Sequence, residues 1–240
     1  MNAPGIVFEG GATLDGAPLF APLRLELAAE RWTCLLGPSG VGKSTILRLI
    51  AGLDAPVDFE GRIAADDGAP IPPRVAYMAQ SDLLFPWASV AENVMVGARL
   101  RGERPDRARA ADLIARVGLS DHAAKRPHQL SGGQRQRAAL ARTLMEDRPI
   151  VLLDEPFSAL DARTRAEMQD LAVNLLAGRT VLLVTHDPGE AARLGHAIHV
   201  MTGAALEGFD APHAPAPRAV DDAAMLRLQG DLHRFLLEAA

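Results

Sequence analysis

Several features that mark whole classes of protein are missing from this 240-residue sequence. It has one cysteine, Cys34, so no internal disulfide can form, and we expect a reducing compartment, the cytosol. Its longest apolar runs, such as residues 181–184, fall far short of the roughly 18 residues that a membrane span needs. The N-terminus has no basic segment followed by an apolar one, so no secretion signal is expected.

An excess of positive charge is also missing. The formal net charge is -5 and the pI is about 5.8, so the sequence offers no general basic surface, and we expect no nucleic-acid partner. No internal repeat is present. Hydrophobic residues at 48% and charged residues at 23% are ordinary for a soluble globular protein, and the length suits one compact domain with a modest subdomain.

Short apolar runs bounded by turn residues are present and predict strands. These runs are residues 6–8, 23–27, 32–36, 75–78, 150–153, 181–185 and 197–201. Several alternate with helical patterns, of which 161–177 is the clearest, and Gly178 suits the C-terminal cap of that helix. This alternation predicts an α/β core with parallel strands, in which Cys34 is a buried packing residue.

The pattern changes to helices alone between residues 81 and 129. Ser89 and Glu92 have the spacing of a capping box that opens one helix, and residues 107–117 predict another that ends at Gly118. We interpret 81–129 as a small helical subdomain inserted in the main domain, residues 1–207.

The C-terminal residues, 208–240, predict a linker followed by an amphipathic helix. Three prolines in 211–217 indicate irregular structure. The apolar stripe of the helix consists of Met225, Leu228, Leu232, Phe235 and Leu236. Docking on the chain's own domain is favoured over binding to a partner.

A glycine-rich segment between a predicted strand and a predicted helix matches the loop that wraps di- and triphosphates. Its residues are Gly37, Pro38, Ser39, Gly40, Val41, Gly42, Lys43, Ser44 and Thr45. Glycines let backbone N–H groups turn inward around an anion, and the positive end of the helix dipole faces the phosphates. Lys43 would hold the β- and γ-phosphates, and Ser44 would offer a hydroxyl to Mg²⁺.

Two carboxylates, Asp154 and Glu155, follow the apolar run 150–153. A carboxylate at such a strand end can hold Mg²⁺, and Glu155 is placed to orient and deprotonate an attacking water. A plain turn or helix start after a strand also explains an acidic pair, but the phosphate loop favours the catalytic interpretation.

A second helix start follows at residues 130–134, Leu-Ser-Gly-Gly-Gln. Ser131 and Gln134 have the capping-box spacing, and the glycines permit a close approach of the backbone to an anion. A well-capped helix is the simpler explanation. A second phosphate-facing helix start in a chain that already has one phosphate loop, however, requires a reason.

With these motifs in this order, the chain resembles the ATP-binding cassette (ABC) family over about residues 5–207. The phosphate loop matches the Walker A motif, residues 130–134 match the family signature, and Asp154-Glu155 matches Walker B with its catalytic glutamate. Gln80 matches the Q-loop glutamine, residues 158–161 match the D-loop and His186 matches the switch histidine. The resemblance implies a P-loop NTPase core with a small antiparallel β part and an inserted helical subdomain.

The resemblance also implies an ATPase whose cofactors are ATP and Mg²⁺ and whose two copies pack head to tail. Each ATP would then lie between the Walker A loop of one copy and the signature of the other. The implied catalytic residues are Glu155, His186, Gln80 and Lys43. The implied Mg²⁺ ligands are Ser44, Gln80 and Asp154. The implied contacts to the partner's ATP are Ser131, Gly132, Gly133, Gln134 and Asp161.

One position departs from the family pattern. An aromatic residue near the N-terminus usually stacks on adenine in this family, and the corresponding position here is Leu14. Phe8 and Phe20 are candidates to replace it. A leucine offers area without a π face, so weaker recognition of the base is expected.

Since the sequence has one cassette and no membrane segment, it resembles the separate ATPase subunit of a prokaryotic-type importer. The resemblance implies homodimerisation on ATP binding, integral-membrane permease subunits as partners, an indirect link to a periplasmic or lipid-anchored solute-binding protein, and a peripheral position on the inner face of the cell membrane. Residues 83–87, Leu-Leu-Phe-Pro-Trp, form an apolar loop that would receive a short helix of the permease; internal packing is the alternative.

Residues 84–94 are similar to the ATPases of nitrate, sulfonate and taurine importers, and residues 176–188 lean toward the thiamine-precursor group. Two other functions are considered. A soluble cassette ATPase acting on ribosomes or DNA usually has a second cassette or a long coiled coil, and neither is present. A GTPase or kinase would share the phosphate loop, but the chain has no Asn-Lys-x-Asp sequence, and the signature has no role in those enzymes.

Overall fold

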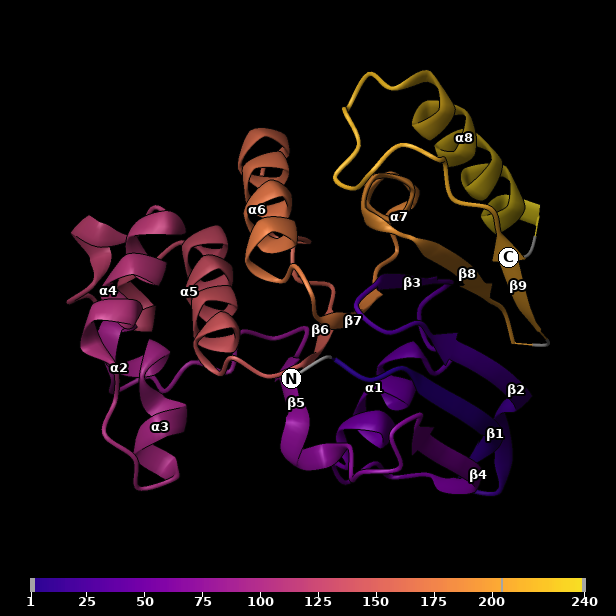
Figure 1. Ribbon diagram of the computed structural model, residues 1–240, viewed down its shortest axis with the longest axis horizontal. Coiled ribbons are helices and arrows are strands. Elements are labelled where there is room, and N and C mark those ends of the chain that lie inside the picture. The colour runs from indigo at the N-terminus through magenta and orange to yellow at the C-terminus, as the bar shows by residue number, and fades with distance from the viewer. Residues whose placement is uncertain (1–2, 204, 239–240) are drawn as a thin grey trace. The chain divides into compact units, whose positions relative to one another are not determined.

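A computed structural model describes residues 3–203 and 205–238, which fall into two compact units (Figure 1). The first unit takes its residues from Met1–Val75, Pro149–Asp154 and Ala177–Ala240, and the second from Ala76–Arg148 and Glu155–Leu176. Among the described residues, no helix is both long and apolar enough to cross a membrane.

The first unit contains both sheets and three α-helices. Its strands are β1 (Ile6–Leu14), β2 (Ala17–Leu27), β3 (Trp32–Leu36), β4 (Asp58–Ala65), β6 (Ile150–Asp154), β7 (Thr180–Val184), β8 (Ala197–Met201) and β9 (Leu206–Phe209). Its helices are α1 (Lys43–Ala51), α7 (Pro188–Leu194), α8 (Ala223–Glu238) and a 3₁₀ turn, Pro72–Arg74.

The larger sheet runs in the order β6-β7-β3-β8-β9 within this unit. The pairs β6–β7, β7–β3 and β3–β8 are parallel, and β9 joins β8 antiparallel. Every residue of β3, β6 and β7 is buried, which is why these strands are almost continuous apolar runs. Cys34 in β3 is fully buried, as predicted. Helix α1 packs against β6 and β7.

The smaller sheet is antiparallel, with the order β2-β1-β4. The rings of Phe8, Phe20 and Phe59 form its core, with Phe8 5.2 Å from Phe59 and 6.3 Å from Phe20 between ring centroids. The predicted small antiparallel part is therefore present. Its strands are longer than the predicted runs 6–8 and 23–27, and β4 was not predicted.

Helices make up most of the second unit. β5 (Val75–Met78) leads into it, and its helices are α2 (Val90–Val94), α3 (Val96–Leu100), α4 (Arg107–Arg116), α5 (Gly132–Met145) and α6 (Ala162–Leu175), with 3₁₀ turns at Ser120–His122 and Pro127–Gln129. The predicted capping box opens α2, because Ser89 and Glu92 bond reciprocally. Gly118, with φ 67°, follows α4 as predicted. Helices α2, α4 and α5 pack against one another.

The C-terminal helix α8 packs against α7, which it crosses (Figure 1). Met225 and Leu232 are buried, and the rest of the predicted stripe is partly buried, so docking on the chain's own unit is confirmed. The segment before α8 is irregular, as its prolines predict. Arg218 fixes it, because the buried guanidinium donates to the carbonyl oxygens of Ala192 (2.9 Å), Gly195 (2.9 Å) and Pro212 (2.7 Å).

Candidate functional site

The phosphate-loop sequence connects β3 to α1 in the first unit. Helix α1 begins at Lys43, its N-cap residue Gly42 makes no side-chain cap bond, and its first turn contains no acidic residue. Nothing in the side chains of this helix start therefore competes for its first N–H groups or its positive dipole end. This is the arrangement that binds phosphate groups.

Two glycines of this loop occupy positions that other residues could not. Gly37 has φ 152°, and a Cβ atom there would collide with the carbonyl oxygen of Met201. Gly42 has φ 101°, and its Cβ would lie 2.6 Å from a ring carbon of Phe20. The loop therefore packs tightly on both sides, which fixes its path around the space before α1.

Lys43 folds back over the loop. Its Nζ donates to the carbonyl oxygens of Gly37 at 2.7 Å and Pro38 at 2.6 Å, and the residue is 7% exposed. These are charge-assisted bonds, and they hold the ammonium group across the mouth of the loop.

Three strands end beside this loop. Gly37 follows β3, Asp154 ends β6 and His186 comes two residues after β7. Since β6, β7 and β3 are adjacent and parallel, their carboxyl ends share one edge of the sheet, which is where ligands bind in open α/β sheets. Asp154 is 3% exposed. A buried carboxylate beside a helix start with Ser44 in its first turn is a donor set that suits Mg²⁺.

The turn that carries His186 is held by Thr185. The Thr185 hydroxyl donates to Glu190 Oε2 at 2.7 Å and accepts from the Asp187 N–H at 3.1 Å. The Thr185 N–H donates to the Leu35 carbonyl at 3.2 Å. His186 itself is exposed. Its backbone is thus fixed at the sheet edge while its imidazole is accessible.

The second unit brings Gln80 and Glu155 together. Gln80 Nε2 donates to Glu155 Oε2 at 3.3 Å. Glu155 has φ 48°, a left-handed conformation that is uncommon for a non-glycine residue and is found preferentially at functional sites. The carbonyl oxygen of Glu155 accepts from Gln136 Nε2 at 2.8 Å and from the Ser158 hydroxyl at 3.1 Å.

The signature residues form the N-terminus of α5, also in the second unit. The capping box that the sequence predicts is present, since Ser131 Oγ accepts from the Gln134 N–H at 3.3 Å and Gln134 Oε1 accepts from the Ser131 N–H at 2.9 Å. Ser131 and Gly132 are exposed. A Cβ atom on Gly133 would lie 3.3 Å from the Ala159 carbonyl oxygen, so the glycine allows the D-loop to lie close.

Asp161 is the N-cap of α6. Its Oδ1 accepts from the Thr164 N–H at 3.0 Å, and this bond holds the pKa of the Asp161 carboxyl below its usual range. The carboxylate is exposed and ionised at neutral pH.

Sequence reasoning missed the residues of α5 that organise the surrounding loops. Arg135 bonds Asp82 Oδ2 at 3.0 Å, and Arg142 donates to the carbonyl oxygens of Leu83 (2.7 Å) and Asp82 (2.6 Å), so α5 fastens the segment after Gln80. The repeated arginines of this helix were the available signal.

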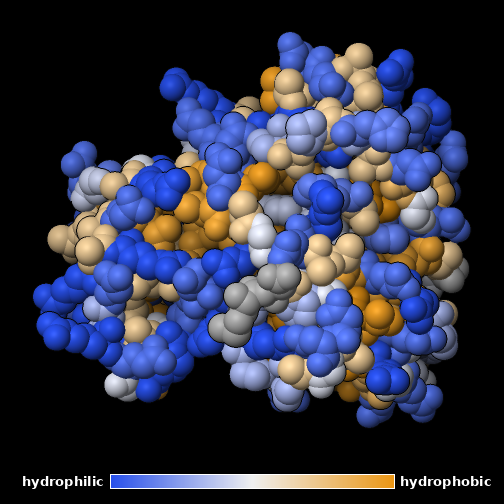
Figure 2. All heavy atoms as spheres, in the orientation of Figure 1, coloured by the Kyte–Doolittle hydropathy of each residue, from blue (hydrophilic) through white to orange (hydrophobic). Residues whose placement is uncertain are grey.

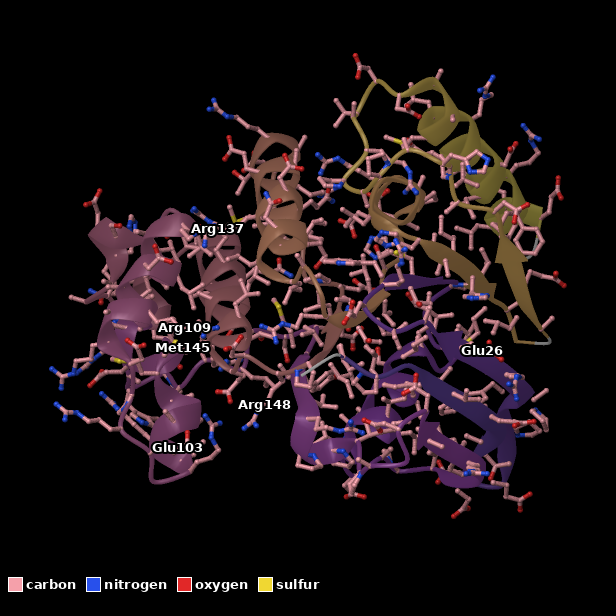
Figure 3. The ribbon with its side chains drawn as sticks, in the orientation of Figure 1. Glu26, Glu103, Arg109, Arg137, Met145 and Arg148 are labelled. Atoms are coloured by element: carbon pink, nitrogen blue, oxygen red, sulfur yellow. The ribbon has the colours of Figure 1, made fainter. Side chains whose placement is uncertain are left out.

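Two further arginines link α4 to α5, and both are labelled in Figure 3. Arg137 of α5 donates to the Val117 carbonyl, at the end of α4, at 2.7 Å. Arg109 of α4 pairs with Asp147, just past α5, at 2.8 Å. Helix α5, which carries the signature, is therefore bonded to the end of α4 from its N-terminal half and to Arg109 of α4 just past its C-terminus.

The structure bears on which residues near Leu14 could stack on adenine. Leu14, at the end of β1, is 38% exposed. Phe8 and Phe20 are 0% and 3% exposed because their rings fill the core of the small sheet, so neither can offer a face to a base. The suggestion that one of them replaces the usual aromatic residue is therefore wrong.

The second unit also has an apolar pocket with a volume of about 390 Å³ between α2, α3 and α4. Its walls include Met95, Ala110 and Ile114, with Arg99 and Arg107 beside them. Figure 2 shows hydrophilic side chains covering this unit around α3, at the lower left. In the loop after Gln80, Leu83 and Trp87 are 61% and 69% exposed.

The parallel strand order, the phosphate loop and the acidic strand end define a P-loop nucleoside-triphosphatase fold. The family model described as ABC transporter matches residues 20–158, more than half of the chain. The chain belongs to this family and is an ABC-type ATPase.

Known relatives extend this similarity over most of the chain. A protein of Haemophilus influenzae named as an uncharacterized ABC transporter ATP-binding protein is 44% identical over 225 residues, which cover 91% of this chain and 92% of the relative. An aliphatic sulfonates import ATP-binding protein of Agrobacterium fabrum is 46% identical over 206 residues, with 80% and 77% covered. Among solved structures, a dimeric post-hydrolysis state of an ATP-binding cassette with ADP and Pi matches with a TM-score of 0.76 at 28% identity, and the match covers 88% of this chain and 100% of that one.

Proposed function

We propose that this chain is the ATP-hydrolysing subunit of an ABC importer and that it works as a head-to-tail dimer with ATP at the interface. The observation that carries the proposal is the presence of two helix N-termini suited to phosphate, at α1 in one unit and at α5 in the other. The relative named for sulfonate import and the dimeric structural neighbour support it.

In this proposal the first unit holds the nucleotide. The loop N–H groups and Lys43 bind the phosphates, and Lys43 exchanges its carbonyl partners for phosphate oxygens. Ser44, Asp154 and Gln80 would hold Mg²⁺, which neutralises developing charge on the phosphates when it is bound. Leu14 would lie on the adenine side.

Hydrolysis would need a base and an oriented water. Glu155 would accept a proton from the water as its oxygen attacks the γ-phosphorus and the bond to the ADP oxygen breaks in line. Gln80, which bonds the Glu155 carboxylate, and His186 would orient the water and the γ-phosphate. Ser131, Gly132, Gly133, Gln134 and Asp161 would contact the nucleotide of the second copy.

Because the γ-phosphate would bridge two copies, its departure would remove the anion that holds the interface, and the dimer would loosen. Residues 1–207 would form the ATPase domain, with 81–129 as its inserted helical subdomain and 208–240 as linker and C-terminal helix. The second unit of the structure also includes α5 and α6.

The decisive experiment is Glu155→Gln. It should lower kcat for ATP hydrolysis by about 10²–10⁴-fold, the usual worth of a general base, while ATP binding persists and traps a dimer visible by light scattering. Lys43→Ala should instead lose nucleotide affinity. Hydrolysis by Glu155→Gln at the rate of the unmodified protein would remove Glu155 as the base.

The permease is the proposed membrane partner, through which the chain would lie on the inner face of the cell membrane. The pocket between α2, α3 and α4 has an apolar lining and arginines beside it, which suits a short helix with an apolar anchor and a carboxylate. The exposed Leu83 and Trp87 provide further apolar contact area. A periplasmic or lipid-anchored solute-binding protein would act indirectly.

The proposed cargo is a solute of the nitrate, sulfonate and taurine group or of the thiamine-precursor group. Sequence resemblance at residues 84–94 and the sulfonate-import relative support this. The test is the ATPase activity of the chain co-purified with its neighbouring permease, which should rise only when the correct solute is added. Co-purification of the chain with ribosomes or DNA, and not with a permease, would contradict the importer function.

A further inference from the structure

Gln136 lies on α5, in the turn after the signature residues, and bonds this helix to the loop 155–159 of the second unit. Its amide nitrogen donates to the Glu155 carbonyl at 2.8 Å and to the Ser158 hydroxyl at 3.4 Å. Its amide oxygen accepts from the Ala159 N–H at 2.8 Å. The residue is 6% exposed, so both ends of one buried amide are engaged with the loop that starts at Glu155.

We propose that Gln136 is a positioning residue that couples the signature helix to the catalytic glutamate of the same chain. The proposal rests on the function proposed above, in which Ser131 to Gln134 contact the partner's nucleotide and Glu155 is the base. It adds a physical connection between these two roles.

The bonds from Gln136 hold the backbone of Glu155. Its left-handed conformation, φ 48°, costs free energy and persists only where surrounding contacts require it. The Glu155 carbonyl accepts from Gln136 and from Ser158, and Gln136 also bonds Ser158. These bonds hold the peptide that orients the Glu155 side chain, whose carboxylate is bonded to Gln80.

Gln136 also bonds the D-loop. Gln136 accepts from the Ala159 N–H, and Gly133 allows the Ala159 carbonyl to lie close to the first turn of α5. The same loop continues to Asp161, the N-cap of α6. Helix α5 is therefore bonded to the start and the middle of the segment 155–161.

Ser131 and Gln136 are connected by one continuous helix, α5. Helix α5 is a 14-residue element, and the hydrogen bonds of its N-terminal half are those of a regular helix, so a shift at Ser131 moves Gln136 with it. A phosphate bound at the N-terminus of α5 would therefore set the position of the Glu155 backbone through Gln136. Occupancy of one nucleotide site of the dimer would be communicated to the base of the other.

The test is Gln136→Met, which keeps approximate side-chain volume and removes both polar groups. We expect kcat for ATP to fall by about 10²-fold, the cost of a 1 Å misplacement of a catalytic group, with the KM for ATP unchanged because the phosphate loop is untouched. Gln136→Glu keeps an acceptor for the Ala159 N–H but loses the donor to the Glu155 carbonyl, and should also lower kcat.

The matched control is Thr143→Val on the same helix. Thr143 is equally buried at 4% exposure, and its hydroxyl donates to the Ala139 carbonyl within α5. The kcat of the Thr143→Val variant should equal that of the unmodified protein. A fall in kcat as large as that of Gln136→Met would show that α5 responds to any buried change, and would overturn the proposal.

A second readout separates positioning from folding. Gln136→Met in the Glu155→Gln background should still form the ATP-dependent dimer, because the signature contacts are intact. An unchanged kcat, a raised KM with kcat unchanged, or loss of that dimer would overturn the role of Gln136. If the Glu155→Gln single variant itself hydrolyses ATP normally, the proposed function fails first, whatever Gln136 does.

Discussion

Leu14 is an aliphatic residue at the position that, by resemblance to the family, would face adenine. It is 38% exposed, so a larger side chain can be accommodated there without repacking the core. Leu14→Tyr should tighten ATP binding by about 2–10-fold, since aromatic stacking adds about 0.5–1.5 kcal/mol beyond area burial. Calorimetric titration measures this, with Leu14→Ile as the aliphatic control. An affinity unchanged by the tyrosine would contradict the assignment of Leu14 to the adenine side.

His196 makes the stability of the first unit depend on pH. The Trp32 N–H donates to His196 Nδ1 at 3.1 Å, and burial, reinforced by Arg31 and Arg218, lowers the pKa of His196. In the unfolded chain the pKa returns to about 6.5. The unfolded state therefore takes up the proton first, so this stabilisation is complete above about pH 6.5 and is lost as the pH falls toward the folded-state pKa.

The measurement is the free energy of unfolding by urea at pH 7.5 and pH 5.5. For the unmodified protein, the free energy of unfolding should be lower at pH 5.5 than at pH 7.5. His196→Asn offers an amide oxygen near the place of Nδ1 without a titrating group. The free energy of unfolding of this variant should therefore decrease less between pH 7.5 and pH 5.5. Equal losses in the two proteins would show that His196 does not contribute.

Arg218 joins the segment before α8 to the end of α7. Its guanidinium satisfies two carbonyl groups at the C-terminus of α7 and one in the irregular segment. Arg218→Ala should lower the free energy of unfolding by about 1–3 kcal/mol, because buried acceptors lose a charged donor. Urea denaturation measures it. Arg218→Lys keeps the charge but lacks the planar fork and should be intermediate, whereas an alanine variant of full stability would contradict this role.

The sequence predicts the fully buried strands well because their environment is uniform. The runs at 32–36, 150–153 and 181–185 match β3, β6 and β7 to within one residue at each end. β4 and β9 were missed, since residues 58–62 of β4 include three charged side chains and a glycine, and that segment is a strand only because it pairs with β1. Local patterns do not contain such pairing information.

In the candidate site, too, some features follow from local sequence patterns and others depend on contacts between distant residues. The phosphate loop, the acidic pair and both capping boxes are local patterns, and they can be read from the chain. Gln136 cannot, because a glutamine in an arginine-rich helix suggests a solvated side chain. Its partners, Glu155 and Ala159, are distant in sequence, so only the folded chain shows the connection.

At the scale of the whole molecule, contact with the permease should depend on the loop after Gln80. Trp87 is 69% exposed and stacks on Phe85, with ring centroids 5.2 Å apart. Asn93 holds the loop independently of Trp87, since it bonds the backbone of Phe85, Ala88 and Ser89. Trp87→Ser should therefore weaken co-purification with the permease at least several-fold while the melting temperature stays unchanged, as expected for an interface aromatic.

Leu237 provides the matched control for this experiment. It is also 69% exposed but lies on α8, so Leu237→Ser removes a comparable exposed apolar side chain from a different surface. Permease capture by this variant should equal that of the unmodified protein. Undiminished capture by Trp87→Ser would exclude the loop from the interface.

The two bonds from Lys43 to its own loop have a consequence for the energetics of nucleotide exchange. Because the ammonium group is already bonded to Gly37 and Pro38, an arriving phosphate would replace these partners and would not meet an unordered side chain. The conformational entropy of the lysine is lost during folding, so binding is spared that cost. When the product leaves, the carbonyl oxygens of Gly37 and Pro38 would compete with it for the ammonium group, which would favour release of the nucleotide and restore the original loop.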